Sequence, residues 1–142
     1  MSSSAFAREE RLRFVDFQFN TEPNGRCKAE VTLGFGAEMR WRGTAEGLAS
    51  DAGEMRCAAE ATLHAIEASA NGVITFELLG VKAVRAFDTI VLIVSVVSRE
   101  SGQTHRLVGS FLADQQHTRG AALAVLNATN RVMGNIFARE PS

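Results

Sequence analysis

The sequence predicts an α+β domain made of two βββα repeats related by a pseudo-two-fold axis. Three observations lead to this fold class. Strand-like runs occur in two groups of three, each group is followed by a segment with helical spacing, and the two halves share a pattern of small residues. Helices that follow runs of antiparallel strands are typical of layered domains, in which the sheets pack against the helices.

Three strand patterns open the first repeat, residues 11–72. In the first pattern, apolar residues alternate with polar ones, but the phase slips by one position between Phe14 and Val15. Since such a slip exchanges the two faces of a strand, we expect a β-bulge there. A Glu-Pro-Asn-Gly turn signal leads into a clean alternation at residues 29–35. A third, short strand contains Trp41.

The period then changes to that of a helix. We expect this helix to begin with Asp51 as the N-cap, because an aspartate side chain can accept a hydrogen bond from a free amide of the first turn. Glu54 can reach back, as in a capping box. Asn71 and Gly72 should end the helix, since both residues tolerate the left-handed conformation.

The second repeat, residues 73–137, follows the same order. Its first strand is long, and we expect a bulge near Gly80. The expected elements are strands at 73–87, 89–98 and 105–112 and a helix at 117–137. We interpret residues 1–10 and 138–142 as tails, so that the chain forms a single domain.

Small residues relate the two halves directly. Gly43 recurs 66 positions later as Gly109, each on the last strand of its half. Five helix residues recur 63 positions later: Ala58, Ala59, Ala61, Leu63 and Ala65 correspond to Ala121, Ala122, Ala124, Leu126 and Ala128. We therefore expect a duplicated unit whose alanine faces let the helices lie close to the sheets.

The strand at 89–98 is apolar on both faces, which an antiparallel sheet covered on one side does not require. Either a second layer or a second subunit must cover the other face. We favour a homodimer, because two-fold homo-oligomers are the commonest assemblies.

Composition excludes several other classes of protein. The net charge of −1 argues against a nucleic-acid partner. The longest apolar run, residues 90–97, is far shorter than the ~20 residues of a membrane helix, and the start of the chain lacks the pattern of a secretory signal. We therefore expect a cytoplasmic protein without a membrane partner. Cys27 and Cys57 should be reduced thiols, and no ligand spacing indicates a metal site.

Candidates for catalysis are few. The sequence contains no nucleophile elbow, P-loop or dinucleotide fingerprint, so we expect no cofactor. Asp88 and His105 are the side chains that a small cofactor-free enzyme could use, although a turn aspartate is the simpler interpretation of Asp88. His64 and Glu67 fit a solvated helix face better than a catalytic dyad. Asn127, Asn130 and Arg131 share one face of the last helix, and two asparagines there suggest hydrogen bonds from their side chains to a nearby loop.

The arrangement resembles the C-terminal regulatory (dimerisation) domain of α-isopropylmalate synthase and its citramalate synthase relatives. The closest match is the segment 124–131, Ala-Val-Leu-Asn-Ala-Thr-Asn-Arg, which is similar to the final-helix pattern of that family. Further similar positions are Gly43, Gly47, Asp51, Val81, Lys82, Ala83, Val84, Asp88, Gly109, Ser110 and Asp114. The chain departs from the family at residues 48–50, where Leu-Ala-Ser replaces a Pro-Val, and it lacks the catalytic barrel.

The resemblance implies a non-catalytic, dimeric domain that senses an end-product amino acid or a similar small acid at the dimer interface, near the loops preceding the helices. Free amides at helix starts suit such a carboxylate. Carried over residue by residue, the implied ligand-binding positions are Gly47, Ser50, Asp51, Ser110 and Asp114. A separately encoded enzyme is then a candidate partner. The alternatives are a structural dimerisation protein without a ligand and a small enzyme that uses Asp88 or His105.

Overall fold

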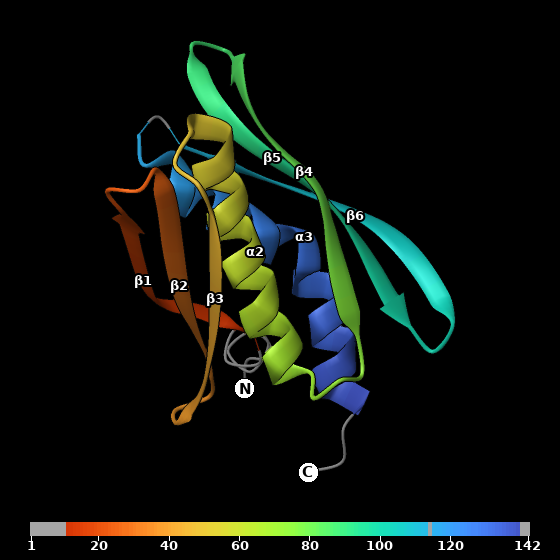
Figure 1. Ribbon diagram of the computed structural model, residues 1–142. Helices are drawn as coiled ribbons and strands as arrows, with labels where there is room; N and C mark the ends of the chain where they lie inside the picture. Colours follow the sequence, from red (N-terminus) through yellow and green to blue (C-terminus); the bar gives the residue numbers. More distant parts are fainter. Residues whose placement is uncertain (1–10, 114, 140–142) are drawn as a thin grey trace.

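The structure, a computed structural model, describes residues 11–113 and 115–139. It contains two antiparallel three-stranded sheets, each followed by a helix (Figure 1). The elements are β1 (Arg13–Thr21), β2 (Arg26–Phe35), β3 (Met39–Leu48), α2 (Asp51–Ser69), β4 (Thr75–Ala86), β5 (Thr89–Glu100), β6 (Gln103–Leu112) and α3 (His117–Arg139). The predicted α+β fold with two successive βββα units is confirmed.

The two helices lie side by side between the two sheets (Figure 1). The first sheet has the strand order β1-β2-β3 and packs on α2 through β2 and β3. The second sheet has the order β4-β5-β6 and packs on α3 through β5 and β6, while β4 also contacts α2. Both helices therefore bury most of their surface, and their N-termini lie at the same end of the molecule.

Equivalent glycines explain how closely the helices approach the sheets. A Cβ on Gly43 of β3 would press on the backbone of Ala61 and Ala65 in α2. A Cβ on Gly109 of β6 would press in the same way on Ala124 and on the residue four positions further along α3. Only glycine leaves room for such backbone approach, and the predicted repeat of glycine and alanine positions therefore has a common structural cause.

A second pair of equivalent contacts joins each helix to its own sheet. The side chain of His64 makes a 2.7 Å hydrogen bond, through Nδ1, with the carbonyl oxygen of Thr44. The side chain of Asn127 donates to the carbonyl oxygen of Ser110, also at 2.7 Å. Thr44 and Ser110 each follow the strand glycine that the two repeats share. The hydrogen bond predicted for Asn127 exists, but its partner lies on a strand rather than in a loop.

Both predicted bulges are present. The pairing of β1 with β2 shifts between Phe14 and Asp16, and the pairing of β4 with β5 shifts between Leu78 and Gly80. After the first bulge Phe17 and Phe19 pack on the side of the helices, and after the second bulge Val81 does. The phase slip in the sequence was therefore a reliable sign of the bulge.

The start of α2 differs by one residue from the prediction. Ser50, and not Asp51, is the N-cap, and its hydroxyl accepts a 3.1 Å hydrogen bond from the amide of Gly53. Serine in an extended conformation is among the most favourable N-caps, which leaves Asp51 as the first helical residue. The predicted end of the helix is confirmed, because Asn71 and Gly72 have φ of 54° and 80°.

Candidate functional site

The starts of α2 and α3 form the walls of a cleft of about 440 Å³. The pseudo-two-fold relation between the repeats places the two helix N-termini next to each other, so both repeats contribute to it. The lining residues are Phe19, Asp51, Glu54, Met55, Gln115, Gln116, His117 and Thr118. Its volume lies in the range of about 300–1,000 Å³ that is typical of small-molecule sites.

This cleft offers two kinds of charge complementarity. The first turn of each helix carries amides without partners inside the helix, and the helix dipole adds partial positive charge there. Asp51 and Glu54 bring negative charge to the same place. Phe19 and Met55 add an apolar surface. A ligand with a carboxylate, an ammonium group and a small apolar part would find a matching group for each.

The five residues implied by the family resemblance are spread over different places. Asp51 lines the cleft, and Ser50 caps the helix beside it. Gly47 faces α2, where a Cβ would lie 3.6 Å from the carbonyl oxygen of Gly53. Ser110 is exposed on the face of β6 that is turned away from α3, since its neighbour Gly109 faces that helix. Asp114 lies outside the described residues.

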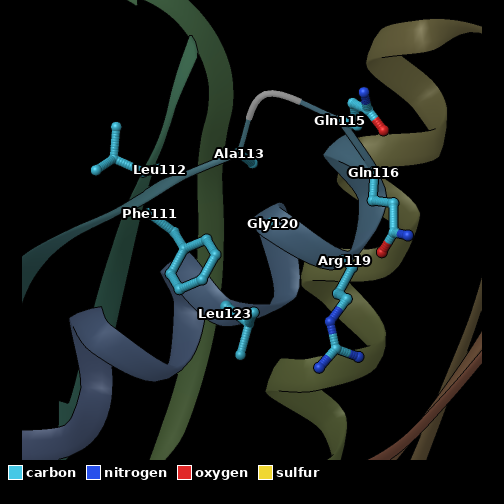
Figure 2. A pocket seen from close by; sticks show the side chains of 8 residues that line it. All are labelled: Phe111, Leu112, Ala113, Gln115, Gln116, Arg119, Gly120 and Leu123. Atoms are coloured by element: carbon cyan, nitrogen blue, oxygen red, sulfur yellow. The ribbon is translucent and has the colours of Figure 1, made fainter. Parts of the chain in front are cut away.

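A second cleft, of about 350 Å³, lies on the other side of the first turn of α3 (Figure 2). It is lined by Phe111, Leu112, Ala113, Gln115, Gln116, Arg119, Gly120 and Leu123. Gln115 and Gln116 therefore border both clefts, and Gln116 has a φ of 54°. The guanidinium of Arg119 stacks 4.9 Å from the ring centroid of Phe14 on the first sheet. The sequence analysis singled out none of these three residues.

The correspondence between the two repeats could have drawn attention to Arg119. Arg56 lies 63 positions earlier, at the equivalent place in α2. It donates a 3.2 Å hydrogen bond to the carbonyl oxygen of Leu78 on β4, which occupies the position equivalent to Phe14 on β1. In both repeats an arginine of the helix thus reaches to the first strand of the other repeat.

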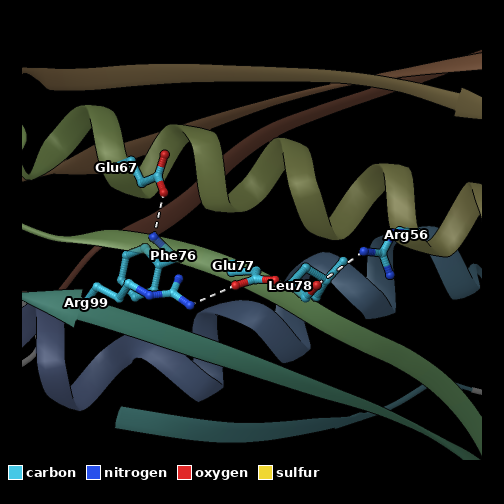
Figure 3. A network of polar contacts seen from close by, with 6 residues as sticks. All are labelled: Arg56, Glu67, Phe76, Glu77, Leu78 and Arg99. Carbon is cyan, nitrogen blue, oxygen red and sulfur yellow. Dashed lines mark hydrogen bonds and ion pairs between the residues drawn. The ribbon is translucent and has the colours of Figure 1, made fainter. Parts of the chain in front are cut away.

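Polar groups near β4 hold secondary structure together (Figure 3). Glu67 accepts a 2.6 Å hydrogen bond from the amide of Phe76, which ties the end of α2 to the start of β4. Arg99 and Glu77 form a 3.0 Å ion pair across β5 and β4. Glu67 therefore bonds to a strand and His64 to the carbonyl of Thr44, so that this pair has a structural role.

Asp88 and His105 do not share a site. Asp88 lies in the exposed turn between β4 and β5, with a φ of 62°. His105 is exposed on β6, opposite Ser98. Because Ser98 lies near the other end of β5, the two side chains are separated by roughly 30 Å along that strand.

The two cysteines are buried free thiols at the interface of α2 and the first sheet. The thiol of Cys57 donates to the carbonyl oxygen of Ala45 at 3.2 Å. Burial, together with the neighbouring Cys27, raises the pKa of the Cys57 thiol to about 12. Since the thiolate is the reactive form, Cys57 is a poor nucleophile at neutral pH.

Over residues 11–113 and 115–139, no group of three His, Cys, Asp or Glu side chains is arranged to hold a metal ion. Neither of the two helices, in the part of the chain that the structure describes, is long and apolar enough to cross a membrane.

No protein-family model matches the chain, and no curated protein is significantly similar to it. The resemblance to the regulatory domain of α-isopropylmalate synthase therefore depends on the residues quoted above and on the order of the elements.

Proposed function

We propose that this chain is a non-catalytic regulatory domain, which binds a small amino acid or organic acid in the cleft between the starts of α2 and α3. The observation that carries the proposal is the convergence of two helix N-termini and two carboxylates on one cleft of about 440 Å³. A separately encoded enzyme is the partner whose activity such a domain would control.

The chemistry of the cleft favours an α-amino acid. The carboxylate of the ligand would accept hydrogen bonds from first-turn amides, as anions commonly do at helix starts. Its ammonium group would lie against Asp51 and Glu54, and its side chain against Phe19 and Met55. A simple organic acid would use the amides but leave the two carboxylates without a cationic partner.

A thermal-shift screen with amino acids and short organic acids tests this function. Ligand at 100 times its Kd should stabilise the folded protein by about 2.7 kcal/mol, which raises Tm by roughly 5–11 °C for a domain of this size. Asp51→Asn should greatly reduce the response to amino acids. Glu38→Gln is the control, because Glu38 is exposed in the β2–β3 turn.

Two results would count against the proposal. One is a screen in which no amino acid or organic acid raises Tm. The other is an Asp51→Asn variant that responds to an amino acid as strongly as the Glu38→Gln control, because the site would then lie elsewhere.

The second candidate is a structural dimerisation protein without a ligand. It is supported by the exposed apolar residues on the second sheet. The small enzyme that would use Asp88 or His105 stays a prediction; both side chains are exposed, and neither lines the two clefts at the start of α3.

A further inference from the structure

The face of the second sheet that is turned away from the helices is apolar at its centre. Along β5, Leu92, Val94 and Val96 point to the helices and are buried, while the alternate residues Val91 and Ile93 point outward. We call the outward side the outer face of the second sheet. Its apolar residues are Val84, Val91, Ile93, Val97, Val108 and Leu112, and the polar residues Lys82, Ser95 and Ser110 lie between them. Val108 and Leu112 on β6 are 64% and 65% exposed.

The equivalent face of the first sheet has a different chemistry. Its outward residues are mostly polar or charged: Asp16, Gln18, Lys28, Glu30, Thr32, Arg40, Arg42 and Thr44. Arg42 and Glu30 form a 2.9 Å ion pair across it. The fold therefore does not require an apolar outer face, and the one on the second sheet calls for a separate explanation.

An exposed aromatic residue extends this apolar surface. Phe87 lies at the turn between β4 and β5 and is fully exposed. The turn projects beyond the end of β6 (Figure 1). Phe87 and Asp88 both have positive φ, at 54° and 62°, a turn conformation that favours Asn and Gly. The exposed ring of Phe87 therefore adds to the apolar surface that a partner could cover.

We propose that a second copy of this chain covers the outer face of the second sheet, about a two-fold axis parallel to β5. In this arrangement β4 of one subunit lies against β6 of the other. Val84 and Leu112 both flank Val91, so Val84 meets the partner subunit's Leu112. The fully apolar row of the face therefore meets its own copy.

The charged row supports the same axis. Glu77 on β4 and Arg106 on β6 both flank Val97, near the other end of the face. The two-fold axis brings Glu77 opposite the partner subunit's Arg106, and this pair forms twice. Glu77 and Arg106 are thus complementary in charge across the axis, which a symmetric interface requires. Arg99 on β5, which forms an ion pair with Glu77 of its own subunit, lies close to the axis beside the partner subunit's Arg99.

The size of the face fits a small dimer. Three strands of about ten residues cover an area about 34 Å long and about 14 Å wide. Because side chains project from the sheet, its accessible surface is larger than this flat area and approaches the ~800 Å² that each partner buries in a standard interface. Phe87 extends past β6 of the partner, towards the apolar cleft beside the partner subunit's Leu112 and Ala113 (Figure 2).

This interface supplies the second subunit of the proposed regulatory domain, but it uses none of the residues of the ligand cleft. An absent dimer is therefore detected by the mass of the protein in solution, and absent ligand binding by an unchanged Tm in the thermal-shift screen. The two failures can be distinguished.

Sedimentation velocity of the full chain tests the interface. Between 1 and 200 µM (a range chosen to span roughly micromolar affinities), wild type should sediment with a mass near twice 15.3 kDa. Leu112→Asp should raise the Kd for dimerisation at least about 100-fold. Leu48→Asp is the matched control, since Leu48 is 64% exposed on the first sheet, and it should remain dimeric. Phe87→Ser, which changes only an exposed turn, should raise Kd about 10-fold.

A charge reversal tests the direction of the axis. Arg106→Glu should weaken the dimer about 10-fold, because it places two acidic groups opposite each other. The double variant Glu77→Arg/Arg106→Glu should restore the affinity. A monomeric wild type at 200 µM (the top of a roughly micromolar range), or Leu112→Asp as dimeric as Leu48→Asp, would overturn the interface. A double variant weaker than Arg106→Glu alone would overturn the axis.

Discussion

Two glycines in equivalent positions allow a direct test of the duplicated fold. A Cβ added to Gly43 would lie 3.0 Å from the Cα of Ala65 in α2. A Cβ added to Gly109 would lie 2.7 Å from the Cβ of Ala128 in α3. In both cases the obstacle belongs to a packed helix rather than to a flexible side chain, so the helix itself must move away from the sheet.

We expect Gly43→Ala and Gly109→Ala each to lower the free energy of unfolding by about 2 kcal/mol. Overpacking in a filled interior costs about 1–3 kcal/mol, and contacts with backbone atoms place both sites near the upper end of that range. The restricted unfolded chain offsets about 0.4–1 kcal/mol of this cost. For a domain of this size, the net loss lowers Tm by roughly 4–8 °C.

Urea unfolding, followed by the fluorescence of the single tryptophan, measures these losses. Trp41 is half-buried and its ring lies 6.5 Å from that of Phe137, so unfolding changes its surroundings. Gly80→Ala is the matched control, because an added Cβ there meets no atom within 4 Å. If Gly43→Ala or Gly109→Ala is as stable as Gly80→Ala, the close approach of helix and sheet is wrong for that repeat.

Three further perturbations address single contacts. Ser50→Ala should lower the free energy of urea unfolding by about 1 kcal/mol and more than Asp51→Ala does, because Ser50 is the cap; the reverse order would restore Asp51 as the cap. Asn127→Ala should cost about 1 kcal/mol in the same assay, while Asn127→His should retain most of the stability, because histidine makes the equivalent contact in the first repeat. In the folded protein the pKa of the Cys57 thiol is about 12, above its ordinary value of 9.0. Its stabilising contribution is therefore complete below pH 9 and declines above it by up to about 1.4 kcal/mol per pH unit, a slope that should be smaller in Cys57→Ala.

Features encoded by neighbouring residues could be predicted from the sequence. The bulge after Phe14 and the left-handed end of α2 at Asn71 and Gly72 each depend on a few consecutive positions, and the structure has both. The equivalence of Gly43 and Gly109 could also be predicted, because a repeat makes a distant relation visible as a regular spacing.

The contents of the clefts could not be predicted in the same way. Arg119 and Gln116 border a cleft because two separate helix starts meet, and neither residue belongs to a local pattern. The bond from the amide of Phe76 to Glu67 joins the end of a helix to the following strand, and nothing in the sequence marks it. The N-cap is Ser50 and not the predicted Asp51, because adjacent residues of similar capping ability compete for this position. The residue with the extended backbone conformation before the helix becomes the cap, and that residue is Ser50.

The differences between the two repeats indicate where function resides. Contacts that hold the helices against the sheets are shared: the strand glycines, the bond from His64 or Asn127 to a strand carbonyl, and a helix arginine that reaches the other repeat. These positions are constrained by packing, which is the same problem in both halves. The outer faces of the sheets and the loops before the helices are not constrained in this way, and they are the places where the halves diverge. The first sheet is mostly polar outside, whereas the second carries apolar residues at the centre of its outer face. Recognition of a second subunit and of a small ligand should therefore be sought in these regions rather than in the shared core.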